Sequence, residues 1–474
     1  MLDFRKINFG KTDGNEESRV WPELLKNGYL DIDSVVDQAL NSRIFLFLGY
    51  KGSGKTALSE HIKLISSECV KTNIYSLKDF PYKTFGKLVS GDIESETKYK
   101  LTWRWLLLIL VLKELCNDEK AICGKQSELD KTIEILTQAD IFPIMNISDL
   151  VRKSSTRSFK AEVMKISIEH TSSNENANVS FEWMIDYVKS LILCFSEMSK
   201  YTIVIDGLDE ILTSNEIQYK TIVALINEIR DINNLFCESS FPIKICVLCR
   251  IDIFERLPDP NKNKIRRDSS YSFDWYEEGA KSSESKLIAI ANKRTQLIYS
   301  DVDDMFATFF PKYYRNNKKG IETEMLEYTR HTPRDFLQLL ISIQKKCKSN
   351  RIEVNDIDKG ISDFSIEYFL PEIKDEMVGY IPYRDIDNVI NALGALHSSK
   401  LTFSQFSTSI ANYQLSDNIT PIEIMKILYD CSAIGHQYSN GIFEFKYRNR
   451  NSTFNPGEDI VIHKGLRKAL NLDK

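Results

Sequence analysis

The chain has 474 residues, of which 42% are hydrophobic and 27% are charged, and its formal net charge is −5. This length predicts two to four domains, and the composition is typical of a globular protein with a sizeable core. The negative balance excludes a general attraction of the whole chain to nucleic acid or to a membrane surface. The chain begins without an apolar signal core, and its longest apolar run, residues 105–112, is too short to cross a bilayer. We therefore expect a cytoplasmic protein without membrane segments.

Residues 1–40 are expected to form an N-terminal lead-in, with turn-forming residues at 9–17 and a helix at 33–40. Such a segment either covers a ligand held by the motif that follows it or remains a solvated arm. The sequence leaves both alternatives open.

Residues 44–58 indicate a buried strand, a glycine-rich turn and a helix. The turn, Gly49-Tyr-Lys-Gly-Ser-Gly-Lys-Thr56, has the Walker A pattern, in which glycines let the backbone approach phosphate oxygens at a helix N-terminus. Lys55 is expected to contact the outer phosphates of ATP, and the Thr56 hydroxyl to bind Mg²⁺. The predicted nucleotide-binding residues are Gly49, Lys51, Gly52, Ser53, Gly54, Lys55, Thr56 and Ala57.

The next segments predict a strand at 73–77, an apolar helix at 101–115 and an insertion at about 117–180. The insertion contains a possible strand or hairpin at 158–171. A helix at 181–197 then leads into a second motif.

This second motif is a continuously apolar strand, residues 201–205, that ends in Asp206-Gly-Leu-Asp209-Glu210. A strand without a polar face predicts a parallel sheet with helices on both faces. Asp206 would emerge at the carboxyl end of the strand, where ligands collect in such sheets, and hold Mg²⁺ through its water shell. Asp209 or Glu210 would polarise the attacking water; alternatively, both acids only stabilise a helix N-terminus.

The Asp-Gly-Leu-Asp-Glu segment resembles the Walker B box of STAND ATPases, in particular their NACHT-like members. STAND proteins belong with the AAA+ and origin-recognition ATPases in one P-loop division. The resemblance covers about residues 46–340, apart from 117–180. It implies a P-loop core with an additional strand, a helical lid, a winged-helix domain in many members, and ATP-dependent assembly. Bacterial relatives of this plan are often stress or phage-defence ATPases, which is an analogy only.

Four arginines are candidate contacts for the γ-phosphate. Arg250 ends a predicted strand, as the γ-phosphate sensor of STAND ATPases does; a structural salt bridge is the alternative. Arg266 and Arg267 lie where AAA+ relatives present an arginine finger to a neighbouring subunit, although a solvated charge cluster is favoured. Arg334 lies in the first turn of a predicted helix and resembles the sensor-2 arginine of AAA+ lids.

The last unit, residues 381–474, predicts helices at 385–395, 403–412 and 421–431, followed by two strands within 443–463. This order is typical of a winged helix. On one predicted strand, Lys446, Arg448 and Arg450 alternate and would share a face that could contact nucleic acid. Because acids balance bases over the whole unit, a protein contact or lid closure is favoured over DNA reading.

Cys246 and Cys249 have the spacing of a metal-binding pair, but they lie in a predicted strand without a second pair. We expect buried thiols there, as for most of the cysteines, in a reducing compartment.

Together these features predict an α/β fold with a lead-in (1–40), a P-loop ATPase core (41–280), a helical lid (281–380) and a winged-helix domain (381–474). The expected function is an ATP-hydrolysing switch that controls homo-oligomer assembly or an effector protein. A nucleic-acid-associated ATPase similar to origin-recognition initiators is the alternative. A scaffold that binds nucleotide without turnover is a third hypothesis.

Overall fold

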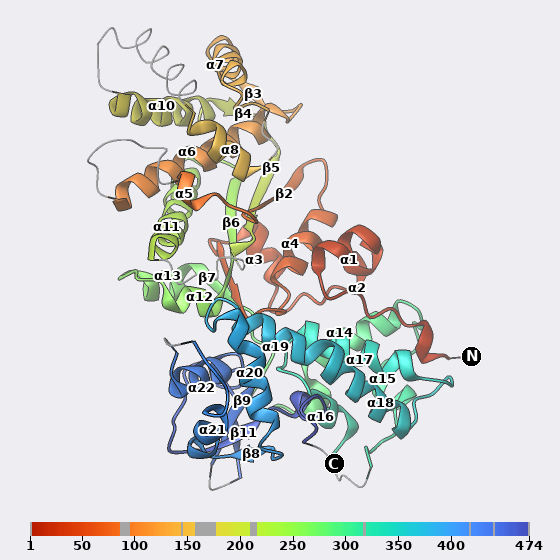
Figure 1. Ribbon diagram of the computed structural model, residues 1–474. Helices are drawn as coiled ribbons and strands as arrows, with labels where there is room; N and C mark the ends of the chain where they lie inside the picture. Colours follow the sequence, from red (N-terminus) through yellow and green to blue (C-terminus); the bar gives the residue numbers. More distant parts are fainter. Residues whose placement is uncertain are drawn as a thin grey trace.

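A five-stranded parallel sheet with the order β2-β5-β6-β1-β7 forms the centre of the N-terminal half (Figure 1). The computed structural model describes residues 2–85, 95–143, 146–156, 177–208, 216–315, 319–416, 419–438 and 441–472. The strands are β1 (Leu46–Gly49), β2 (Val70–Ser76), β5 (Lys200–Asp206), β6 (Ile243–Arg250) and β7 (Ser270–Ser272). Because β6 lies between β1 and β5, the two motif-bearing strands are not neighbours, and the additional strand implied by the resemblance is present.

Both faces of the sheet are covered by helices, as the continuously apolar strands predicted. On one face, Phe47 and Leu248 pack with α3 (Val35–Asn41) and α4 (Lys55–Leu64). On the other face, Leu48 packs with three long helices. These are α6 (Ser95–Cys116), α10 (Ala177–Ile192) and α11 (Glu216–Glu238). Cys246 and Cys249 are buried in these two different cores, so the pair cannot share one metal ion.

The insertion after α6 contains short elements at the far end of α6 from the lid (Figure 1). They are β3 (Ile122–Cys123), α7 (Gln126–Gln138) and α8 (Ile147–Ser154). Two elements outside the insertion contact it: β4 (Phe195–Ser196) pairs with β3, and α5 (Tyr82–Phe85) packs on α8. The strand or hairpin expected at 158–171 lies outside the described residues.

The segment before β7 is helical. It forms α12 (Ile251–Arg256) and α13 (Lys262–Ser269), and β7 ends at Ser272. Ile265, which is 2% exposed, anchors the polar α13 against the core formed with α11.

The lid shares one hydrophobic core with the α4 face of the sheet and with Phe4, Ile7 and Phe9 of the N-terminal segment. The N-terminal elements are η1 (Phe4–Lys6), α1 (Gly14–Val20) and α2 (Pro22–Gly28). The lid contains α14 (Lys286–Gln296), α15 (Met305–Phe309), α16 (Ile321–Leu326), α17 (Pro333–Lys346), α18 (Val354–Phe364), a π-helical turn (Ser365–Phe369) and α19 (Leu370–Met377). Thr332 caps α17 by accepting the Asp335 N–H, and Pro333 occupies its first turn, which confirms the predicted helix start.

The C-terminal unit combines three helices with a four-stranded antiparallel sheet of order β10-β9-β11-β8. The helices, all predicted, are α20 (Tyr383–Gly394), α21 (Phe403–Ile410) and α22 (Pro421–Asp430). The strands are β8 (Lys400–Leu401), β9 (Ile434–Gln437), β10 (Phe443–Glu444) and β11 (Asp459–Ile462). We refer to this unit as the winged helix.

The prediction that Lys446, Arg448 and Arg450 share one strand face was wrong. β10 ends at Glu444, and the chain then turns, because the N–H groups of residues 448 and 449 both donate to the Phe445 carbonyl.

None of the helices in the described parts of the chain has the length and apolarity that crossing a membrane requires.

Candidate nucleotide-binding site

The Walker A turn connects β1 to α4 and needs glycine at two positions. Gly52 (φ 80°) and Gly54 (φ 96°) adopt left-handed backbone conformations, which favour glycine. At Gly52 a Cβ atom would also lie only 2.9 Å from Arg334 Cβ. The turn therefore leaves no room for a side chain where the lid meets the loop.

Two residues from the separate motifs meet beside the N-terminus of α4. The Thr56 hydroxyl donates to Asp206 Oδ2 at 3.0 Å, although 150 residues separate the two in sequence. The other carboxylate oxygen, Oδ1, accepts the N–H of Gly207 at 2.7 Å. A hydroxyl and a carboxylate are oxygen ligands that suit Mg²⁺. The described residues include no group of three or more His, Cys, Asp or Glu that could hold a metal ion.

Lys55 is buried, with 5% of its surface exposed. Its Nζ donates to the carbonyl oxygens of Gly49 (3.1 Å) and Tyr50 (3.2 Å). The ammonium group is thus held inside the turn, where the N-terminus of α4 also favours an anion.

The lid contacts the Walker A turn directly through the start of α17. The Arg334 N–H donates to the Gly52 carbonyl at 3.3 Å. Glu372 on α19 lies between two cations, with its Oε2 3.1 Å from Lys51 Nζ and 3.7 Å from Arg334 Nη1. These are ion pairs without directed hydrogen bonds, because Glu372 Oε2 and the buried Arg334 Nε have no hydrogen-bond partner in the described part of the chain.

The N-terminal lead-in lies against this site. A small pocket of about 90 Å³ is bordered by the Walker A turn, by Lys11 and Thr12 of the lead-in, and by Arg334 of the lid. Gly14 packs so closely on α4 that a Cβ atom would lie 3.0 Å from the Ala57 backbone nitrogen. A buried ion pair between Arg294 and Glu17 (2.6 Å) ties the lead-in to α14. The lead-in therefore packs on the P-loop region and is not a solvated arm.

Arg250 is placed next to the Walker A turn, since it pairs in register with Gly49. Its guanidinium binds Asp252 with two hydrogen bonds, of 3.0 and 2.8 Å. Burial alone would raise the pKa of Asp252, but the charge and hydrogen bonds of Arg250 lower it below its usual value. These contacts are those of the salt-bridge alternative, and a phosphate-sensing role would require Arg250 to exchange partners.

Arg266 and Arg267, two of the remaining predicted residues, do not join the site. Arg266 on α13 pairs with Glu255, and Arg267 is exposed. Both precede β7 at the edge of the sheet opposite the Walker A turn, so they do not contact the nucleotide site of their own chain. Asp209 and Glu210 lie outside the described residues.

Two residues that the sequence analysis did not assign to this site also contact the Walker A region. Trp275, which follows β7, donates its indole N–H to the Ser53 carbonyl at 2.9 Å. From the winged helix, Arg450 donates to the Phe273 carbonyl at 2.9 Å, and its guanidinium lies 5.9 Å from the ring centroid of Tyr50. No sequence pattern predicts these contacts, because they join segments that are far apart in the chain.

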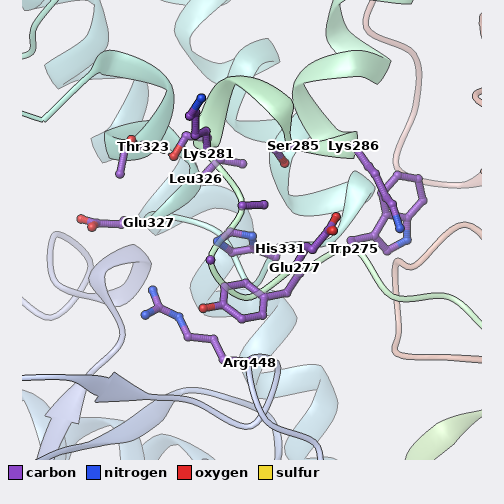
Figure 2. Close-up of a pocket in the computed structure, with 14 residues that line it drawn as sticks. Trp275, Glu277, Lys281, Ser285, Lys286, Thr323, Leu326, Glu327, His331 and Arg448 are labelled. Carbon is purple, nitrogen blue, oxygen red and sulfur yellow. Dashed lines mark hydrogen bonds between the residues drawn. The ribbon is translucent and has the colours of Figure 1, made fainter.

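The linker after β7, the lid and the winged helix meet around a second pocket of about 220 Å³ (Figure 2). His331 stacks on Tyr447 at 5.3 Å, and the Arg448 side chain faces this pocket from the winged helix. Burial and the charge of Arg448 lower the pKa of His331 to about 3, so the imidazole is neutral at pH 7. Arg448 is thus part of an interface within the chain, and Lys446 donates to the Ser452 carbonyl at 2.5 Å.

Comparison with protein-family models and with curated proteins found no match. Among solved structures, the chain is similar to that of the Orc1 protein of Aeropyrum pernix in complex with DNA. The identity is 10% and the TM-score 0.37, over 93% of this chain and 90% of that chain. A likeness of this size carries no argument about family or function, and the specific resemblance to STAND ATPases gains no support from it. The chain is an α/β protein. Its parallel sheet and the contact of Thr56 with Asp206 are those of a P-loop core, which is followed by a helical lid and a winged helix.

Proposed function

We propose that the protein binds ATP with Mg²⁺ and hydrolyses it as a switch of the STAND/AAA+ type. The observation that carries this proposal is the contact of the Thr56 hydroxyl with the Asp206 carboxylate at the N-terminus of α4. A P-loop enzyme needs this juxtaposition, because the hydroxyl and the acid hold one cation against the phosphates. The ammonium group of Lys55 is held in the same turn.

In this proposal each residue has one task. The backbone N–H groups of the Walker A turn and Lys55 bind the phosphates, while Thr56 and Asp206 hold the cation. Bound Mg²⁺ would neutralise charge that develops on the transferred phosphoryl group. Asp209 or Glu210 would orient the attacking water, as their place after Asp206 predicts. The unpartnered Arg334 Nε suits contact with an anion brought by the nucleotide.

Asp206→Asn tests the proposal, because it keeps the side-chain shape and removes the charge. We expect Mg²⁺-dependent phosphate release from ATP to fall by roughly 100-fold, about 2.8 kcal/mol in transition-state stabilisation. We also expect Mg²⁺ to lose its effect on the affinity for a fluorescent ATP analogue. Asp303→Asn, which removes an exposed acid of the lid, is the matched control. Equal phosphate release and equal Mg²⁺ dependence in the two variants would refute the assignment.

The switch would work through Glu372, which pairs with two cations of the site in the described conformation. Its carboxylate would compete with phosphate for Lys51 and Arg334, beside the pocket of about 90 Å³ at the Walker A turn. ATP would therefore displace Glu372 and change the position of α19, which passes the signal to the winged helix or to a partner protein.

Glu372→Gln is expected to raise the affinity for ATP by roughly three- to tenfold, since a half-buried ion pair of this kind contributes about 1 kcal/mol. The measurement is a titration of the fluorescent ATP analogue at constant ionic strength. Glu367→Gln removes an exposed acid one turn earlier and should leave the affinity unchanged. An unchanged or lower affinity in Glu372→Gln would show that Glu372 does not compete with nucleotide.

A nucleic-acid-associated ATPase remains the alternative proposal. Its predicted contact residues, Lys446, Arg448 and Arg450, make contacts within the chain instead of forming a common surface. The DNA in the Orc1 structure belongs to that protein. Binding of duplex DNA that weakens when Lys446 and Arg448 are changed to glutamine would favour this alternative.

A further inference from the structure

A large cavity lies at the amino edge of the parallel sheet, opposite the Walker A turn. It has a volume of about 890 Å³, and residues before or at the start of β1, β5, β6 and β7 line it together with α11 and α13. Figure 1 shows α13 below α11. Since β6 has 8 residues, the two edges lie roughly 25 Å apart at about 3.3 Å per residue. We name this cavity the amino-edge groove.

Positive charge dominates the groove. Its charged lining residues are five cations and one acid: Arg43, Lys200, Arg230, Lys244, Lys264 and Asp268. The chain as a whole carries a net charge of −5, so this concentration departs from the average surface. Like charges that face one hollow repel each other, and an anionic ligand would relieve that repulsion.

Few carboxylates compensate these cations. Among the described residues, only Arg230 has a carboxylate within ion-pair distance, and this is its exposed neighbour Asp231 (3.2 Å). Lys244 donates to the uncharged Gln38 carbonyl at 2.7 Å, and burial lowers its pKa. Arg43 and Lys264 are exposed and make no hydrogen bond or ion pair within the described residues. The lining thus presents donors that a bound anion could use.

We propose that the amino-edge groove binds a compact ligand that carries several phosphate groups. Arginine and lysine are the side chains that bind phosphate, by bidentate hydrogen bonds and by charge respectively. The volume lies within the range of about 300–1,000 Å³ that is typical of small-molecule sites. The cations come from five separate segments and converge on one hollow, whereas a nucleic-acid duplex requires a basic stripe along the surface. Phe241 and Pro242 add an apolar wall beside the exposed Asn234.

The amino-edge groove is separate from the proposed ATPase site. The test therefore uses a variant whose ATPase site is disabled. In a Lys55→Met background, inorganic tripolyphosphate is titrated into the full chain by calorimetry at low salt. The groove variant is Arg43→Gln/Lys264→Gln, which removes two exposed side chains without described polar contacts and should not disturb folding. The control is Lys6→Gln/Lys131→Gln, which removes the same charge from two exposed positions outside the groove.

The groove variant is expected to bind tripolyphosphate at least tenfold more weakly than the background, and the control to change affinity less than twofold. Higher salt should weaken binding in the background and the control. Equal affinity in groove variant and control would overturn the proposal. The background protein is also titrated with a single-stranded oligonucleotide. If the oligonucleotide bound more tightly than tripolyphosphate and its binding disappeared in the groove variant, the proposal of a compact ligand would be overturned and the groove would be assigned to nucleic acid.

Discussion

Replacement of Lys55 by methionine is expected to weaken ATP binding by roughly 100-fold or more. Methionine keeps the buried aliphatic stem and removes the ammonium group, which now donates to the carbonyls of Gly49 and Tyr50. Charge-assisted hydrogen bonds contribute about 1.5–3 kcal/mol each, and 1.4 kcal/mol corresponds to about a tenfold change in affinity. Equilibrium titration with a fluorescent ATP analogue in the presence of Mg²⁺ measures the effect.

Lys63→Met is the control for this prediction. Lys63 lies on the same helix, α4, but it is exposed and its side chain makes no described polar contact. Its affinity for ATP should equal that of the wild type, and thermal unfolding without nucleotide should show that both variants fold. If Lys55→Met bound ATP as the wild type does, the assignment of the nucleotide site to the Walker A turn would be wrong.

The second large effect concerns stability, and Asp335→Asn is expected to lower the free energy of unfolding by about 3 kcal/mol. Asp335 is fully buried at the start of α17 and accepts hydrogen bonds from Arg330 Nε (2.9 Å), Arg330 Nη2 (3.0 Å) and Tyr368 (2.8 Å). Arg330 also pairs with Glu376 of α19. Loss of the Asp335 charge leaves the buried Arg330 guanidinium with Glu376 as its one remaining charged partner among the described residues. This site lies next to the contact between the lid and Gly52.

Denaturant unfolding at pH 7 measures this change, with the exposed Glu367→Gln as a control that should differ from wild type by less than about 0.5 kcal/mol. Equal stability of Asp335→Asn and wild type would show that the pair with Arg330 contributes nothing net, as happens when desolvation cancels attraction.

The pH dependence of the same difference follows from the pKa of Asp335. Burial alone would raise this pKa, but the charge and hydrogen bonds of Arg330 lower it below the usual 3.8. A carboxyl group whose folded pKa is lowered contributes stability above its unfolded pKa and loses it as pH falls through the folded pKa. The difference between wild type and Asp335→Asn should therefore be constant from about pH 7 to pH 5 and shrink below about pH 4.

The sequence by itself determined the local parts of this protein. The Walker A glycines, the start of α17 and the three helices of the winged helix each depend on neighbouring residues, so pattern and spacing were enough to place them. Apolar strands without a polar face also predicted a parallel sheet covered on both sides, because only that arrangement buries both faces.

Only the tertiary structure decided which distant groups meet. It placed β6 between the two motif-bearing strands, brought Trp275 to the Ser53 carbonyl and joined Lys51 to Glu372. It also bent the chain after β10, which removed the shared face expected of Lys446 and Arg448. The amino-edge groove is of the same kind, since its five cations come from five segments. Contacts between such segments depend on how helices and strands pack, and no periodicity along the chain records that packing.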